Sequence, residues 1–398
     1  MSKCVTVYTQ AYNVENYIEQ CIKSVLSQTF QDFEWILVEN GSTDKTREII
    51  RKYAALDERI KPDYFDVNQD GFTNYYIAEK ADGRYIVKID SDDWIEPEYL
   101  EKLIAPFEDP DVDISICGAV NYEEETGRET PHEYGELDGV YSKSDIEKQF
   151  IEMRSYMGTY WGKMFRREIF CSILPDMKEI GEKLKKGDNF GGDVAFALCY
   201  LGECKKLAFV NERMYHYRIH NNSYATRTIG TNRVFSCLAL RETEHHFLHK
   251  VNAYTEQNVI MVDLLFWQNI EQLFKNIIRA DWDTDQKIKT ISEVCANKDL
   301  QLLRKEAYNS KVRTILMGDI AWCYMNAGNS KYLKNVLMLL EPDIFDSISN
   351  ETYEWMRENQ ILMSYIIMGE FDNAKRYMEE ITTGNKVDYI RELQQRMH

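Results

Sequence analysis

The stretch VKIDSDDWIEPEYL, residues 87–100, runs from an apolar segment through a cluster of carboxylates into a helical pattern. The carboxylates of Asp90, Asp92 and Asp93 stand within four consecutive positions. Negative charges this close repel one another, and aspartate is depleted from β-strands. A chain keeps such a cluster where turn geometry, solvent or a bound cation makes it tolerable. The chemistry of the protein depends on which of these applies here.

Strand and helix patterns alternate around this stretch. β-Branched and aromatic runs between turn residues favour strands, and apolar residues at helical spacing favour helices. The expected strands are residues 5–9, 33–38, 59–65, 84–89 and 113–120. The expected helices are residues 17–26, a segment after Gly41, and residues 71–83 and 96–107. The alternation predicts an α/β fold with a Rossmann-like, mostly parallel, doubly wound sheet flanked by helices.

Polar side chains follow three of the expected strands at their carboxyl ends. Tyr12 follows the first strand, Asn40 the second, and the acidic cluster at residues 90–93 the fourth. Ligands of such sheets bind beyond the carboxyl ends of the strands. We therefore expect these three segments, which are far apart in the sequence, to share one crevice.

The pattern becomes irregular after residue 120. Within residues 121–230 we expect one helix to begin at a capping box formed by Ser144 and Glu147. Long loops beside a sheet of this kind commonly complete a substrate pocket. We therefore assign residues 1–230 to one domain.

Residues 231–398 have helical periodicity almost throughout. A Tyr-x-x-x-Gly pattern occurs at 324–328 and again at 365–369. Two such copies favour helical hairpins of a tetratricopeptide-like kind. We expect an all-α C-terminal domain that binds a partner, positions a substrate or forms a homo-oligomer.

Composition limits the partners and the location. The 48 Lys and Arg residues against 66 Asp and Glu residues give a net charge of −18, which disfavours nucleic acid. The nine cysteines contain no C-x-x-C pair, which argues against both a disulfide framework and a structural zinc site. No apolar run approaches the roughly 20 residues of a spanning helix. We expect a cytoplasmic protein without a transmembrane segment.

The alternate carboxylates Asp90 and Asp92 form a D-x-D pattern at the end of a strand. Mg²⁺ and Mn²⁺ are typically held by one or two carboxylates together with substrate phosphates. The alternative is a polar turn that caps the helix starting near Pro97. From the residues alone both interpretations remain open.

Several longer motifs give this pattern a context. Residues 9–46 (TQAYNVENYIEQCIKSVLSQTFQDFEWILVENGSTDKT) and 81–100 (ADGRYIVKIDSDDWIEPEYL) closely resemble family-2 glycosyltransferases of the GT-A fold. The resemblance resumes at YWGKMFRREIF (160–170), GGDVAFALCYL (191–201) and YHYRIHNNS (215–223). It implies transfer of a hexose-type sugar, with inversion, from a nucleotide-diphosphate sugar, expected to be a UDP-sugar. It also implies Mn²⁺ or Mg²⁺ at the D-x-D, and a hydroxyl of a polysaccharide, glycolipid or protein as acceptor.

The resemblance places the nucleotide base against the first strand. Gln10, Ala11 and Tyr12 would lie along the base, with Glu15 close by. Asn40 stands where the family usually has an aspartate that reads the base, so the identity of the base is open.

The same resemblance implies that residues 90–93, the acidic turn, bind the nucleotide sugar and the metal. Asp92 is the strongest metal ligand, and Asp90 would contact the ribose or the metal. Ser91 belongs to the same donor-binding segment. Asp93 would support the turn and nearby acceptor contacts.

Asp193 matches the family's general base, in a motif where Gly192 replaces the customary glutamate. It would accept the proton of the acceptor hydroxyl while the diphosphate leaves. The alternative is that Asp193 caps a helix.

The segment before Arg84 lacks an arginine that the family often has. Lys163, Arg218 or His220 would then help to neutralise phosphate, or they are ordinary polar residues. Trp161 would stack on an acceptor sugar, or it belongs to the core.

Two other functions stay open at this level. The departures at Glu39, Asn40 and Gly192 and the missing arginine fit a glycosyltransferase-like scaffold that has lost turnover and acts through its helical tail. A nucleotidyltransferase also holds Mg²⁺ with carboxylates but needs a Gly-rich, basic loop after the first strand, and TQAYNVENY (9–17) contains none.

Overall fold

The structure is a computed structural model that describes residues 4–69, 74–132, 137–220 and 232–280, and then 282, 286, 289–290, 293–294 and 296–306. Backbone proximity divides the chain into one unit of Met1–Arg227 with Phe235–Asp263 and another of Thr228–Val234 with Leu264–His398. The expected domain boundary near residue 230 stays a prediction. The expected hairpins at 324–328 and 365–369 lie outside the described residues.

One ten-stranded sheet forms the centre of the first unit, in the order β3-β2-β1-β4-β9-β6-β10-β5, with β7 beside β6 and β8 beside β10. The strands are β1 (Val5–Ala11), β2 (Phe33–Asn40), β3 (Ile60–Phe65), β4 (Tyr85–Lys88), β5 (Trp94–Ile95), β6 (Val112–Glu123), β7 (Arg128–Pro131), β8 (Gly139–Ser142), β9 (Lys163–Arg166) and β10 (Lys206–Ile219).

The sheet is mixed and mostly parallel. β3, β2, β1 and β4 pair in parallel, as do β6 and β10. β9 pairs antiparallel with both β4 and β6, so these two strands also run in the same direction. The expected α/β class and the five expected strands are confirmed. No strand was expected for the five others, which are the short β5, β7, β8 and β9 and the 14-residue β10.

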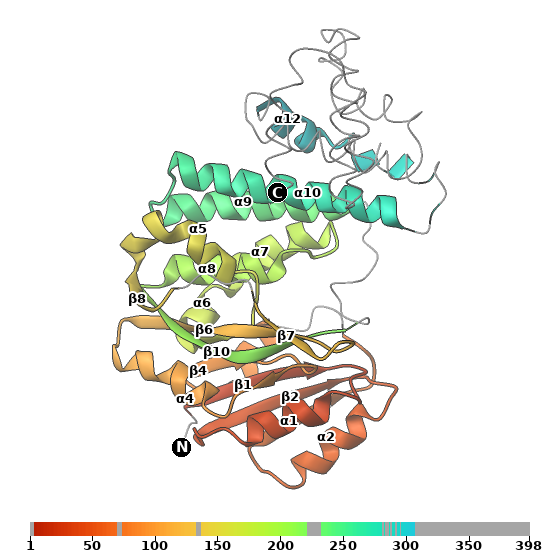
Figure 1. Cartoon of the computed structure of the whole chain (residues 1–398), viewed down its shortest axis with the longest axis vertical. Helices are drawn as coiled ribbons and strands as arrows, with labels where there is room; N and C mark the ends of the chain where they lie inside the picture. Colours follow the sequence, from red (N-terminus) through yellow and green to blue (C-terminus); the bar gives the residue numbers. More distant parts are fainter. Residues whose placement is uncertain are drawn as a thin grey trace, which may run out of the picture. The chain divides into compact units, whose positions relative to one another are not determined.

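Helices cover both faces of the sheet. The α-helices of the described residues, in both units, are α1 (Ile18–Leu26), α2 (Thr46–Ala54), α3 (Asn74–Lys80), α4 (Tyr99–Ile104), α5 (Ile146–Tyr156), α6 (Arg167–Ser172), α7 (Leu174–Lys185), α8 (Gly192–Glu203), α9 (Arg233–Lys250), α10 (Glu256–Arg279) and α12 (Lys298–Glu306), with 3₁₀ turns at Ala105–Glu108 and Lys143–Asp145. Residues of α1, α2 and α4 share one buried cluster with the sheet, and residues of α3, α5, α6 and α8 share the other. Figure 1 shows α1 and α2 on one side of the strands and α5, α7 and α8 on the other.

Two local expectations are corrected or left open. The capping box lies at Ser142 and Asp145, two residues before the expected pair, because these side chains exchange bonds with each other's backbone at the start of a 3₁₀ turn. α9, α10 and α12 are the described helices beyond residue 231, and the all-α character of the rest stays a prediction. No described helix is both long and apolar enough to cross a bilayer.

Tyr200 fixes α8 to the sheet. Its hydroxyl accepts a hydrogen bond from the Arg166 N–H of β9 at 2.7 Å and donates one to the Asp113 carbonyl of β6 at 2.7 Å. The ring is fully buried. One hydroxyl therefore joins two strands and the helix whose first turn carries Asp193.

We expect Tyr200→Phe to lower the free energy of unfolding by about 1–3 kcal/mol, because it leaves a buried N–H and a buried carbonyl without their partner. Urea denaturation measures this change. Tyr141→Phe, at a partly buried position of the edge strand β8, is the control and should stay within about 0.5 kcal/mol of the parent. Equal stability of the two variants would contradict the anchoring role.

Candidate active site

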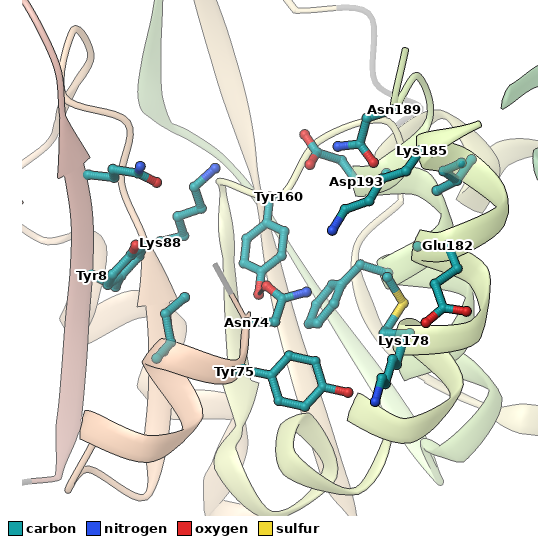
Figure 2. Close-up of a pocket in the computed structure, with 17 residues that line it drawn as sticks. Tyr8, Asn74, Tyr75, Lys88, Tyr160, Lys178, Glu182, Lys185, Asn189 and Asp193 are labelled. Carbon is teal, nitrogen blue, oxygen red and sulfur yellow. Dashed lines mark hydrogen bonds between the residues drawn. The ribbon is translucent and has the colours of Figure 1, made fainter. Parts of the chain in front are cut away.

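A cavity of about 610 Å³ lies between the sheet and helices α7 and α8. Figure 2 shows Tyr8 and Lys88 on the strand side and Lys178, Glu182, Lys185 and Asp193 on the helix side. Its walls combine aromatic rings with charged and amide groups, as in a site for a polar ligand. The lining residues are Tyr8, Gln10, Asn74, Tyr75, Ile77, Lys88, Tyr160, Met177, Lys178, Gly181, Glu182, Leu184, Lys185, Asn189, Gly192, Asp193 and Phe196.

The acidic turn follows β4 directly. The buried side chain of Asp93 anchors it to β10. The Asp93 carboxylate is 1% exposed. It accepts hydrogen bonds from the Tyr215 hydroxyl at 2.7 Å and the Arg218 N–H at 2.8 Å. A buried carboxylate with two such partners is structural. Asp93 therefore supports the turn, and its contact with an acceptor stays a prediction.

Asp90 and Asp92 are more accessible and carry the surplus charge of the turn. Asp90 Oδ1 lies 3.0 Å from Lys88 Nζ, and Asp92 Oδ2 lies 3.0 Å from His220 Nε2. Burial raises the pKa of Asp92, and repulsion from Asp90 raises it further. The buried Nδ1 of His220 has no hydrogen-bond partner among the described residues.

These residues fit a divalent cation. Two carboxylates at a strand end offer oxygen ligands that Mg²⁺ or Mn²⁺ accepts, and a cation would relieve the repulsion that helps to raise the Asp92 pKa. In the described part of the chain, no group of three or more His, Cys, Asp or Glu side chains is arranged to hold an ion. A cation here would thus need further oxygen ligands, as substrate phosphates provide. Ser91 is buried within the same turn.

The residues expected to contact the base lie at the ends of β1 and β2. Tyr12 is 39% exposed and available to a ligand, whereas Ala11 is buried. The Asn40 carboxamide is 2% exposed and bonds Asn68 Oδ1 at 2.7 Å and the Gln69 N–H at 3.0 Å. Asn40 therefore fixes the segment after β3, and its contact with a base stays a prediction.

Glu15 likewise organises a loop. Its carboxylate accepts a hydrogen bond from the Lys45 N–H at 2.9 Å, and its own N–H donates to Asp44 at 3.0 Å. These bonds join the segment after β1 to the start of α2. Glu15 lies near the expected base position, and its contact with a ligand stays a prediction.

Asp193 projects from the first turn of α8 into the cavity (Figure 2). The N-cap is Gly191, with a φ of 78°, so Asp193 is not the cap of this helix. Although its side chain meets solvent in the cavity, the surrounding walls remove enough water to raise the pKa of its carboxyl. The Lys88 ammonium opposes this rise. An accessible carboxylate with a raised pKa can accept a proton near neutral pH.

Two expected phosphate helpers are engaged elsewhere. Lys163 is 1% exposed and donates to the Thr159 carbonyl at 2.6 Å, the Thr159 hydroxyl at 2.9 Å and the Trp161 carbonyl at 3.2 Å. Burial lowers the pKa of Lys163 to about 7. Arg218 donates to the Asp92 carbonyl at 2.8 Å and to Gln20 at 2.6 Å. Both cations therefore support the local backbone.

Trp161 belongs to the core around the acidic turn. It stacks on Tyr215 with ring centroids 4.4 Å apart and on Tyr217 at 5.4 Å. Protein rings thus occupy the surface that an acceptor sugar would need. Its placement fits the core alternative.

The cavity also contains residues that the sequence interpretation did not single out. Lys88, Tyr8 and Tyr160 line it beside Asp193. A signal for Lys88 was present, because it is the one charged residue within the apolar run YIVKI, residues 85–89. Because side chains alternate between the two faces of a strand, Lys88 and Asp90 are expected on the same face of the sheet.

The chain is similar to known proteins in sequence and in structure. The model of Glycosyl transferase family 2 matches residues 6–174. The glycosyltransferase-like protein EpsH of Bacillus subtilis is 31% identical over 305 residues, covering 75% of this chain and 84% of EpsH. Glycosyltransferase GlyA of Streptococcus pneumoniae is 29% identical over 227 residues, covering 55% of this chain and 31% of GlyA. The crystal structure of S. aureus TarS 1–349 in complex with UDP-GlcNAc covers 94% of this chain and 90% of that chain, with 19% identity and a TM-score of 0.45. From the family match and the long alignment with EpsH, the chain belongs to glycosyl transferase family 2.

Proposed function

We propose that the protein is a cytoplasmic, metal-dependent, inverting glycosyltransferase that moves a hexose-type sugar from a UDP-sugar to a hydroxyl of a polysaccharide, glycolipid or protein. One observation carries this proposal. Asp193 and Lys88 line the same cavity, and Lys88 forms an ion pair with Asp90 of the acidic turn. Lys88 thus links the proposed base to the proposed diphosphate-binding turn, because it lines the cavity with Asp193 and pairs with Asp90.

The proposed reaction is a single displacement at the anomeric carbon. The acceptor oxygen forms a bond to this carbon while the bond to the phosphate oxygen breaks, and the electron pair leaves with the nucleoside diphosphate. Asp193 accepts the proton of the acceptor hydroxyl. Attack from the side opposite the leaving group inverts the configuration.

Asp90 and Asp92 are the proposed cation ligands, with His220 beside Asp92. When bound, the cation supplies positive charge that offsets the negative charge on the leaving diphosphate. The remaining residues bind and orient. Tyr12 offers an exposed ring for the base, and the bonds of Asn40 and Glu15 hold the loops around it.

Membership of a glycosyltransferase family favours the enzyme over the scaffold hypothesis. Gly192, which replaces the customary glutamate, does not argue for lost turnover either. Asp193, the proposed base, still lines the cavity. Calorimetry and product assays with a UDP-sugar and Mn²⁺ separate the two functions. Binding without release of UDP would favour the scaffold.

Replacing the base tests the proposal directly. We expect Asp193→Asn to lower the turnover number by about 10²- to 10⁴-fold, because the amide cannot accept a proton. Affinity for the UDP-sugar should be nearly unchanged. Release of UDP from the UDP-sugar, with water as a slow acceptor, measures the rate. Asp176→Asn on the exposed face of α7 is the control, and full activity of Asp193→Asn would exclude this residue as the base.

The raised pKa of Asp193 predicts the pH profile. The base works only when deprotonated, so kcat/KM should fall as the pH drops through its pKa. Because the cavity walls keep water from this carboxyl and raise its pKa, the acidic limb should lie above the ordinary aspartate value of about 4. Initial rates across pH measure the limb, and the residual activity of Asp193→Asn should lack it. A limb at or below the ordinary value would contradict the assignment.

The metal assignment predicts a loss of cation dependence. We expect Asp92→Asn to weaken Mn²⁺-dependent UDP binding by at least about 10-fold, since a neutral amide is a poorer ligand and no longer attracts the cation. Calorimetry measures the affinity for UDP with Mn²⁺ and with EDTA. In Asp92→Asn the ratio of these two affinities should approach one. Asp111→Asn, in a surface ion pair with Lys205, serves as the control. An unchanged Mn²⁺ effect in Asp92→Asn would place the cation elsewhere.

A further inference from the structure

The floor of the cavity is formed by polar side chains of two central strands. Tyr8 of β1 and Lys88 of β4 are register partners in a parallel pair. Their side chains therefore emerge on the same face of the sheet, and Gln10 follows Tyr8 at the next position on that face. All three line the cavity, and Figure 2 labels Tyr8 and Lys88 there.

Two of these groups have unused hydrogen-bonding capacity. The Tyr8 hydroxyl is buried, and among the described residues it has no hydrogen-bond partner. Lys88 carries three N–H donors and forms one ion pair, with Asp90. Buried polar groups are almost always satisfied, so an unpartnered hydroxyl beside an underused ammonium points to a ligand.

The charge of Lys88 is held in place. Its Nζ lies 5.1 Å from the centre of the Tyr160 ring. Its ammonium pairs with Asp90 at 3.0 Å, and its side chain lines the cavity with Asp193. Lys88 therefore lies between the acidic turn and the proposed base.

Other cations near the site have different partners or positions. Lys163 and Arg218 donate to backbone carbonyls and side chains of their own segments. Lys178 and Lys185 line the helix wall of the cavity. Among the described lysines of the cavity, only Lys88 pairs with the acidic turn.

We propose that the Lys88 ammonium and the Tyr8 hydroxyl bind the diphosphate of the sugar donor. This inference rests on the proposed function. A diphosphate next to Asp90 would lie within reach of the ammonium that Asp90 already contacts. Lys88 and Tyr8 donate hydrogen bonds to its oxygens and transfer no proton. Lys88 also offsets the charge that develops as the sugar leaves, the task left open by the missing arginine.

The test compares a nucleoside diphosphate with its monophosphate. We expect Lys88→Met to weaken UDP by roughly 10-fold in calorimetry and to leave UMP nearly unchanged, because only the β-phosphate loses a charge-assisted partner. Lys88→Arg should keep most of the difference. Titrations with Mn²⁺ and with EDTA separate this contribution from that of the cation. GDP and GMP are titrated in parallel so that a different base preference does not hide the effect.

Tyr8→Phe keeps the test independent of folding. It removes a hydroxyl that satisfies no described group, so unfolding stability should not fall, whereas UDP should bind about 3-fold more weakly, the loss of one neutral hydrogen bond. Lys186→Met is the matched control, at an exposed position directly after α7 and outside the cavity lining. It should match the parent in every titration.

The outcomes separate this inference from the function on which it rests. If the parent binds UDP or GDP and Lys88→Met and Tyr8→Phe bind it equally well, the inference is wrong and the enzyme assignment stands. If Lys88→Met weakens UDP and UMP alike, the lysine acts on the fold of the site and the inference is again wrong. If the parent binds neither diphosphate with Mn²⁺, the proposed function fails as well.

Discussion

The buried carboxylate of Asp93 is the constraint on which the site depends. Burying a charge is costly unless hydrogen bonds replace the lost water. Asp93 obtains them from Tyr215 and from the Arg218 N–H, both on β10 and more than 120 residues away in the chain. Burial, followed by repulsion from Asp92 and Asp90, raises the pKa of Asp93 well above its usual range. Asp93 thus anchors the turn to β10, and Asp90 and Asp92 remain accessible at the strand end.

This anchoring explains why several residues that were expected to contact a ligand instead stabilise the turn. Because β10 must reach Asp93, its side chains pack around the turn. The Arg218 guanidinium lies 5.0 Å from the Tyr17 ring and 4.8 Å from the Trp94 ring. Trp161 stacks on Tyr215, the same ring whose hydroxyl holds Asp93. Aromatic and cationic residues near an acidic motif were sensible ligand candidates, but here they surround and stiffen the backbone below it.

The sequence predicted what depends on local patterns. Buried apolar runs such as Phe33–Asn40 identify themselves as strands, and the acidic residues follow the carboxyl end of β4, as the sequence predicts. It did not predict β9, a four-residue strand whose place between β4 and β6 comes from long-range pairing alone. Nor did it predict that the Asn40 carboxamide would form hydrogen bonds with residues after β3. Tertiary packing decides which residues become such partners, and it leaves no periodic pattern in the sequence.

The two glycines before the proposed base show how packing and chemistry divide the same motif. Gly191 has a φ of 78°, and a Cβ there would meet Leu240 at 2.7 Å, so the backbone requires glycine. At Gly192 a Cβ would meet only Asn189 Nδ2, at 3.7 Å, an ordinary contact. Neither the backbone nor the packing requires glycine at that position. Gly192 lines the cavity beside Asp193, so its missing side chain leaves that volume open. The departure from the family pattern at Gly192 therefore enlarges the cavity next to Asp193, and the carboxylate of Asp193 keeps its access to it.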